Sequence, residues 1–256
     1  MGRGATAMRL SVGRKTSFFA SDLPAEVLEQ VLGRLTFPNP NYLEAEKRRF
    51  YTGNIPPLIK GYEIAHGQVF VPRGSTRQLM MILRKAGISY QVNDQRRSLA
   101  KVDFTFTGEL YDFQEQAVSA VMGRDFGVLA APTGSGKTVM ALDLIAIRRQ
   151  PALVAVHTLE LLEQWVERIG TFLGIPASEV GVIGNGKKRI GDKVTVALVQ
   201  SLYKIAYDVA PQIGSLIADE CHRCPSRTFT EAVSAFDCRY MLGLSATPWR
   251  GMGSPA

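Results

Sequence analysis

The chain has few cysteines and no long apolar run. These two features argue against a disulfide-stabilised secreted protein and against a membrane-spanning protein. Three cysteines occur in 256 residues, and an odd, sparse set argues against a disulfide framework and for a reducing compartment. No apolar run reaches the roughly 18–20 residues that a membrane-spanning helix needs, and no secretory segment is visible. We therefore expect a protein that is cytoplasmic or associated with the nucleoid, is not secreted and has no membrane partner.

The cysteines also offer little support for a zinc site. Cys221, His222 and Cys224 lie close together in the sequence, and Cys238 follows later. That spacing matches no recognised zinc finger. Cys221 and His222 moreover belong to a motif with a different use, which is described below.

Positive charge is unevenly distributed along the chain. Residues 1–107 hold 16 Lys and Arg against 8 Asp and Glu, whereas residues 108–256 hold 14 against 15. The excess therefore sits in the N-terminal part, and a basic module favours a polyanionic partner such as a nucleic acid. The alternative is a solvated basic surface without a partner. Our candidate contacts are Lys47, Arg48, Arg49, Arg73, Arg96 and Arg97.

Two hydrophobic patterns meet near Thr107. Before it, short segments predict helices over 25–35 and 76–86, and strands over 9–18, 58–64, 69–71 and 88–92. After it, a helix over 111–122 precedes unbroken apolar strands at 126–130, 152–156, 180–183, 194–199, 213–218 and 239–244. Helices fill most of the gaps, a pattern typical of a parallel sheet covered on both faces. We expect a small basic α+β domain over residues 1–107 and an α/β domain over residues 108–256.

A glycine-rich segment follows the strand predicted at 126–130 and opens a helical pattern. It reads Ala131-Pro132-Thr133-Gly134-Ser135-Gly136-Lys137-Thr138. Strand, tight turn and helix are the context of a phosphate-binding loop, whose N–H groups and helix N-terminus attract anions. We expect Lys137 to reach the β and γ phosphates and the Thr138 hydroxyl to ligate Mg²⁺. Ala131 replaces the first glycine of the general pattern, and the alternative interpretation is a Gly/Ser turn with a chance lysine.

Two adjacent acids, Asp219 and Glu220, end the strand predicted at 213–218. Asp219 can hold Mg²⁺ through water, and Glu220 can polarise an attacking water as a general base. With Lys137 they form the expected catalytic set of a nucleoside triphosphatase. The alternative is an ordinary surface loop.

Three motifs in this order resemble those of superfamily 2 helicases of the DEAD/DEAH-box class. They are the phosphate loop, Asp219-Glu220-Cys221-His222, and Gly243-Leu244-Ser245-Ala246-Thr247-Pro248. The resemblance implies a RecA-like domain that uses ATP and Mg²⁺. It also implies that Ser245 and Thr247 couple the phosphate state to the grip on nucleic acid, and that His222 links the two sites.

Further segments resemble the family's ligand contacts. Gln114 ends a segment similar to the one that reads the adenine edge, although Tyr111-Asp112 stands where the family has Arg-Pro. Thr158, Gln200 and Ser201 lie in segments similar to those that contact the nucleic-acid backbone. The N-terminal domain loosely resembles the small domain of phage recombination helicases and of repair helicases of the xeroderma-group-B type. The implied partner is nucleic acid, DNA in particular.

Motors of this class have two RecA-like domains, and residues from about 109 to 250 resemble the first. The second domain carries an arginine finger, a group worth about 10³–10⁵ in rate. We expect a second helicase half that is supplied in trans or lost by truncation, and slow hydrolysis by this chain alone. Our leading hypothesis is the N-terminal half of an ATP-dependent DNA helicase or translocase for repair or recombination. The alternatives are a nucleic-acid-binding module with a non-hydrolysing ATP site, and a motor subunit of a restriction or remodelling system.

Overall fold

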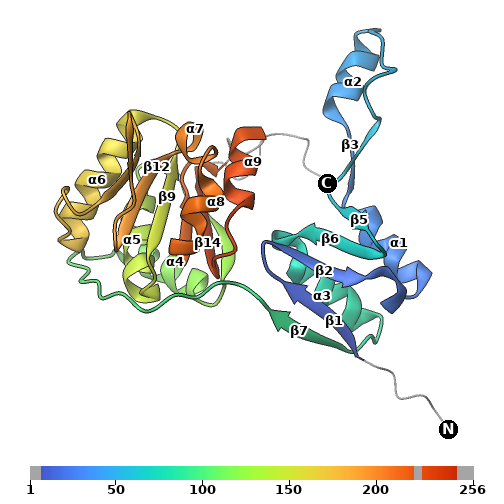
Figure 1. The fold of residues 1–256 in the computed structure, drawn as a ribbon, viewed down its shortest axis with the longest axis horizontal. Coiled ribbons are helices and arrows are strands. Elements are labelled where there is room, and N and C mark those ends of the chain that lie inside the picture. Colours follow the sequence, from blue (N-terminus) through green and yellow to red (C-terminus); the bar gives the residue numbers. More distant parts are fainter. Residues whose placement is uncertain (1–6, 222–226, 247–256) are drawn as a thin grey trace. The chain divides into compact units, whose positions relative to one another are not determined.

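The computed structural model describes residues 7–221 and 227–246 and divides into two compact units, Met1–Gln95 and Arg96–Ala256 (Figure 1). The division falls before the boundary expected near Thr107, because residues 96–107 bond to the second unit. The Val102 amide donates to the Arg149 carbonyl at 2.9 Å, and the Thr107 amide donates to the Phe172 carbonyl at 2.9 Å. Arg97 pairs with Asp237 in the same unit.

The first unit contains, in its described part, a five-stranded sheet in the order β5-β6-β2-β1-β7. A turn at Gly13 splits the single strand expected over residues 9–18 into two antiparallel strands, so that expectation is wrong. β7 pairs in parallel with β1, and the other neighbours are antiparallel. The strands are β1 (Met8–Val12), β2 (Lys15–Phe19), β5 (Glu63–Ala65), β6 (Gln68–Pro72) and β7 (Tyr90–Asp94).

Helices α1 (Ala25–Arg34) and α3 (Thr76–Lys85) bury their apolar faces in the core of this unit. Both helices agree with the amphipathic spacing of the sequence. Their core partners on the sheet include Leu10, Phe18 and Val69, each nearly or fully buried. An extension carries β3 (Thr36–Pro38) and α2 (Pro40–Lys47), which were not expected as regular structure, and β4 (Leu58–Lys60), which falls within the strand expected over residues 58–64. Short 3₁₀ turns lie at Ala20–Asp22 and Arg73–Ser75.

The second unit is built on a sheet that has seven strands in the described residues, in the order β11-β10-β12-β9-β13-β14-β8. All neighbours are parallel except β10 and β11. The expected parallel sheet is therefore confirmed. Its strands are β8 (Phe126–Ala130), β9 (Ala152–Val156), β10 (Gly181–Gly184), β11 (Lys187–Arg189), β12 (Val194–Leu198), β13 (Ser215–Ala218) and β14 (Tyr240–Ser245).

Alternate residues of the central strands feed two separate cores, one on each face of this sheet. Val154 and Val156 pack with the first group of helices, and Leu153 and Ala155 with the second. The first group is α4 (Asp112–Met122), α5 (Lys137–Arg148) and α6 (Leu159–Leu173); the second is α7 (Val199–Leu202), α8 (Ala206–Val209) and α9 (Arg227–Ser234). A 3₁₀ turn, Ala210–Gln212, follows α8. None of the helices among the described residues is long and apolar enough to cross a bilayer.

Gln150 ties the segment that precedes α4 to the rest of the second unit. Its amide oxygen accepts from the Leu99 N–H at 2.7 Å, and its amide nitrogen donates to the Leu99 carbonyl at 3.0 Å. Gln150 is 4 % exposed, so water cannot easily replace these partners. A buried amide that satisfies both backbone groups of one residue therefore holds residues 96–107 in place.

We expect Gln150→Ala to lower the free energy of unfolding by about 1–3 kcal/mol, because it leaves buried groups unpaired. Urea unfolding measures this change, and hydrogen exchange should show lost protection at the Leu99 amide. Gln116→Ala, at an exposed position on α4, is the matched control and should stay within about 0.5 kcal/mol of the parent. Equal stability of the two variants would contradict the prediction.

Candidate nucleotide-binding site

The parallel strands bring the sequence motifs to one edge of the sheet. β14 lies between β8 and β13, and β9 follows on the far side of β13. The phosphate loop leaves the carboxyl end of β8, the two acids leave β13, and Ser245 ends β14. In open parallel sheets, ligands bind beyond the carboxyl ends of the strands. The topology thus gathers residues that lie more than a hundred positions apart in the chain.

The phosphate loop turns at two glycines with left-handed backbone angles. The φ angle is +83° at Gly134 and +78° at Gly136, a region that glycine enters without a steric penalty. A Cβ at Gly136 would lie 2.3 Å from the Gln114 amide nitrogen. Gln114 uses that close approach to donate to the Ser135 carbonyl at 2.9 Å, while its oxygen accepts from the Tyr111 N–H at 3.0 Å. The start of α4 is therefore tied to the loop.

Lys137 is held by the loop that it follows. Its ammonium donates to the carbonyls of Ala131 and Pro132, at 2.9 Å each. Lys137 and Thr138 are the first two residues of α5, where unpaired N–H groups and the helix dipole favour an anion. The Ser135 hydroxyl oxygen is buried and has no hydrogen-bond partner in the described part of the chain. The loop therefore presents several donors to one spot.

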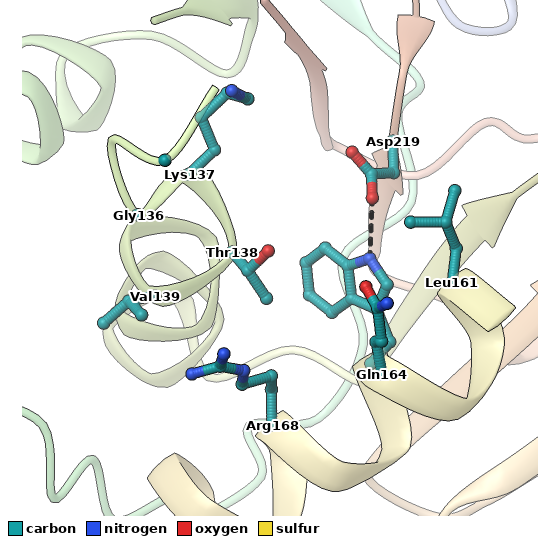
Figure 2. Close-up of a pocket in the computed structure, with 10 residues that line it drawn as sticks. Gly136, Lys137, Thr138, Val139, Leu161, Gln164, Arg168 and Asp219 are labelled. Atoms are coloured by element: carbon teal, nitrogen blue, oxygen red, sulfur yellow. Dashed lines mark hydrogen bonds between the residues drawn. The ribbon is translucent and has the colours of Figure 1, made fainter. Parts of the chain in front are cut away.

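Asp219 is buried opposite the phosphate loop and is held by two N–H donors. Its Oδ2 accepts from the Trp165 indole N–H at 2.8 Å, and its Oδ1 accepts from the Glu220 N–H at 2.9 Å. Burial raises the pKa of Asp219, and the two hydrogen bonds and the nearby Lys137 charge oppose that rise. Figure 2 shows Asp219 across the pocket from Thr138, with the indole hydrogen bond drawn as a dashed line.

Glu220 and Ser245 fix the backbone around this carboxylate. Glu220 has a φ of +52°, an uncommon angle for a residue with a Cβ and one that is concentrated at functional sites. The Ser245 carbonyl accepts from the Ala131 N–H at 3.1 Å. The end of β14 is thus bonded directly to the start of the phosphate loop, while His222 and Thr247 lie outside the described residues.

One face of α6 completes a pocket of about 360 Å³ beside the phosphate loop. Sequence reasoning missed the four residues of this face, Leu161, Gln164, Trp165 and Arg168. Their i, i+3, i+4, i+7 spacing marks one side of a helix but does not say which strand end they face. Figure 2 shows Arg168 and Gln164 on the α6 side and Val139 on the α5 side.

The residues expected to contact nucleic-acid backbone lie at the ends of neighbouring strands. Thr158 follows β9 and caps α6, where its hydroxyl accepts from the Leu161 N–H at 3.3 Å. Gln200 and Ser201 follow β12 and lie in α7. Thr158, Gln200 and Ser201 thus lie on one side of the acids along the carboxyl edge of the sheet.

The cations of the N-terminal unit have different environments. Lys47 ends α2, and Arg48 pairs with Glu44 at 2.5 Å. Arg49 has a φ of +55° and an exposed side chain. Arg73 is only 7 % exposed, so the expected surface contact does not extend to it.

Arg96 and Arg97, which were also candidate nucleic-acid contacts, are engaged in ion pairs instead. Arg96 pairs with Asp125 at 2.9 Å, and Arg97 pairs with Asp237 at 2.9 Å. The bond to Asp237 raises the pKa of Arg97. Both arginines therefore serve the second unit as structural ion pairs, an arrangement that a count of charges cannot foresee.

Comparisons with known proteins agree with this geometry. A family model described as "Type III restriction enzyme, res subunit" matches residues 107–250, more than half of the chain. The DNA 3'-5' translocase XPB2 of Sulfurisphaera tokodaii is 37 % identical over 145 residues, which cover 57 % of this chain and 32 % of that protein. The probable helicase D10 of Escherichia phage T5 is 31 % identical over 166 residues, covering 65 % and 36 %. The chain thus spans about a third of the length of these relatives.

Solved structures share the fold of both units. The crystal structure of the UvsW helicase from bacteriophage T4 superimposes with a TM-score of 0.69 at 16 % identity, covering 94 % of this chain and 93 % of that chain. A second crystal structure of T4 UvsW gives a TM-score of 0.72 at 17 % identity, covering 94 % and 53 %. With its phosphate loop and paired acids on a RecA-like sheet, the chain belongs to the type III restriction enzyme res-subunit family of superfamily 2 helicases.

Proposed function

We propose that this chain is the ATP-binding part of an ATP-dependent DNA helicase or translocase. The observation that carries the proposal is the buried Asp219, held across one pocket from Lys137 and Thr138. The names of the relatives, a DNA translocase and a probable helicase, support the same activity. The basic N-terminal unit supports DNA as the partner, since phosphate contacts dominate affinity for nucleic acid.

The residues present fit a nucleoside triphosphate with a divalent cation. The buried Ser135 hydroxyl has no partner among the described residues, and the open space beside Gly134 would accept phosphate oxygens. Lys137 would exchange the two loop carbonyls for phosphate. Thr138 and Asp219 would hold Mg²⁺, which neutralises developing phosphate charge when bound.

The remaining roles follow from the positions of the side chains. Glu220 would take a proton from the attacking water, since it stands beside the metal-binding carboxylate. Ser245 would transmit the phosphate state, because its carbonyl is bonded to the phosphate loop. We propose His222 and Thr247 as its coupling partners and Gln114 as the adenine contact. Thr158, Gln200 and Ser201 remain our candidates for binding the DNA backbone.

Lys137→Ala should weaken nucleotide binding by about 10- to 100-fold, because a charge-assisted bond to phosphate contributes about 1.5–3 kcal/mol. Binding of a fluorescent ATP analogue measures the affinity, and a melting curve shows that the fold is retained. Lys101→Ala, at an exposed position away from the loop, is the control. Unchanged nucleotide affinity in Lys137→Ala would contradict the site.

Matched amide variants should distinguish the roles of Asp219 and Glu220. Glu220→Gln should retain Mg-ATP binding and lose 10²–10⁴-fold in single-turnover hydrolysis, because it removes the base and keeps the shape. Asp219→Asn should instead weaken the Mg²⁺-dependent part of binding. Both are measured with and without DNA, and identical Mg²⁺ titrations of the two variants would show that the roles are assigned wrongly.

Trp165 adds a positioning role that the sequence motifs do not specify. A buried indole N–H needs an acceptor, and here the acceptor is an oxygen of the metal-binding carboxylate. Each Asp219 oxygen accepts one protein N–H and keeps a lone pair for a cation. Trp165 would therefore fix the direction in which Asp219 presents those lone pairs.

Trp165→Phe removes the N–H and retains an aromatic ring of similar shape. We expect Mg²⁺-dependent nucleotide affinity to fall about 10- to 100-fold, the usual effect of losing a hydrogen bond behind a metal ligand. Nucleotide affinity in the presence of a chelator is the control and should not change. A Mg²⁺ dependence equal to that of the parent would leave Trp165 with a packing role only.

A further inference from the structure

An extension of the first unit contributes nothing to the core of that unit. Residues 36–60 form the β3–β4 pair with α2 between the two strands, and Figure 1 shows α2 and β3 standing away from β1, β2 and β6. No residue of the extension belongs to the hydrophobic core, and Asn39 and Ala45 are its buried members. Stability of the domain therefore does not explain why the extension exists.

The tip of this extension displays two aromatic rings. Phe50 is 65 % exposed and Tyr51 is 80 % exposed, and we call these two residues the aromatic tip. Further large apolar side chains are exposed elsewhere on the extension, at Phe37, Leu43, Leu58 and Ile59, each between 45 % and 51 % exposed. A concentration of exposed apolar groups marks a binding surface more often than a solvated one.

Specific backbone contacts hold the tip in place. A left-handed Arg49 follows the C-cap of α2, and the Phe50 N–H donates to the Ala45 carbonyl at 2.8 Å, as in a Schellman-type helix end. The Tyr51 ring lies over Gly53, where a Cβ would come within 2.2 Å of the phenolic oxygen. Asn39 joins the two ends of the loop, since its side chain donates to the Pro56 carbonyl at 2.8 Å.

The extension that carries these two rings has a net positive charge. Lys47, Arg48 and Arg49 directly precede the tip, and Lys60 lies on β4. The acids of residues 36–60 are Glu44 and Glu46, so cations outnumber acids there. Glu44 is paired with Arg48, whereas Lys47 and Arg49 form no ion pair with any residue in the described ranges. Aromatic rings beside unpaired cations suit unpaired nucleotides, because bases stack on rings while phosphates meet the cations.

We propose that Phe50 and Tyr51 stack on unpaired bases of DNA while Lys47 and Arg49 bind the adjoining phosphates. The inference rests on the proposed function in taking DNA as the partner. It assigns the N-terminal unit a grip on single strands or fork junctions, separate from the backbone contacts proposed at Thr158 and Gln200. Stacking tolerates any base, so this grip is independent of sequence.

The test separates stacking from phosphate contacts through the salt dependence of binding. The whole chain is titrated by anisotropy against a single strand, a duplex and a fork that carries 2-aminopurine at its first unpaired position. Combining Phe50→Ala with Tyr51→Ala should weaken binding to the single strand and the fork at least tenfold, with an unchanged salt slope. The quenching of 2-aminopurine should be lost as well.

Three comparisons complete the design. Combining Lys47→Ala with Arg49→Ala should make the logarithmic salt slope shallower by about 1.4, since each phosphate contact on a single strand contributes about 0.7. Phe19→Ala is the control for aromatic exposure, because Phe19 is 51 % exposed on β2, and it should leave binding unchanged. Tyr51→Trp, with Phe50 left intact, keeps a ring that can stack and should therefore bind the single strand as tightly as the parent does.

Three outcomes would overturn the inference. Affinity for single strands that is unchanged by loss of both rings would remove the tip from the DNA site, provided that the parent chain binds DNA. A parent chain that binds no DNA would overturn the proposed function together with this inference. Self-association of the parent that the alanine pair abolishes, seen by sedimentation, would make the tip a protein interface instead.

Discussion

Parallel pairing of β14 with β8 on one side and β13 on the other is the constraint on which the candidate site depends. Leu244 stands opposite Leu129 in one pair, and Leu242 stands opposite Ile217 in the other. Because side chains alternate between faces, a shift of one residue would turn these apolar groups to the wrong side. Hydrophobic burial thus aligns the ends of the three strands. The polar residues at those ends are therefore positioned by the packing of apolar side chains in the strands, and not by their own hydrogen bonds.

The charged groups of the site are held by fixed dipoles before any ligand arrives. Asp219 receives N–H donors from α6 and from its own loop, and the Lys137 ammonium rests on two carbonyls of the phosphate loop. Preorganised partners of this kind spare the reorganisation that water would require. They also connect elements that are distant in sequence, since Gln114 bonds α4 to the loop and Ser245 bonds β14 to it.

Much of the fold was predictable because its signals are local. Unbroken apolar runs predicted β8 and β9 with their observed ends, and the glycines and paired acids marked the loops at the site. The bond between Trp165 and Asp219 was not predictable, because it joins residues 54 positions apart through a helix orientation that periodicity does not give. α2 was missed because a polar, largely exposed helix has little apolar periodicity. Pairing of Arg96 and Arg97 with acids of the second unit required knowledge of the tertiary structure.

The indole of Trp165 also gives the molecule an optical property. The sequence holds two tryptophans, Trp165 and Trp249, and the first donates its N–H to a buried carboxylate. Emission from an indole responds to the charge and polarity next to its ring nitrogen. Replacing Trp249 with phenylalanine would leave a single tryptophan, whose indole N–H is bonded to the carboxylate opposite the phosphate loop. Events at that carboxylate can then be followed in time without attaching any dye.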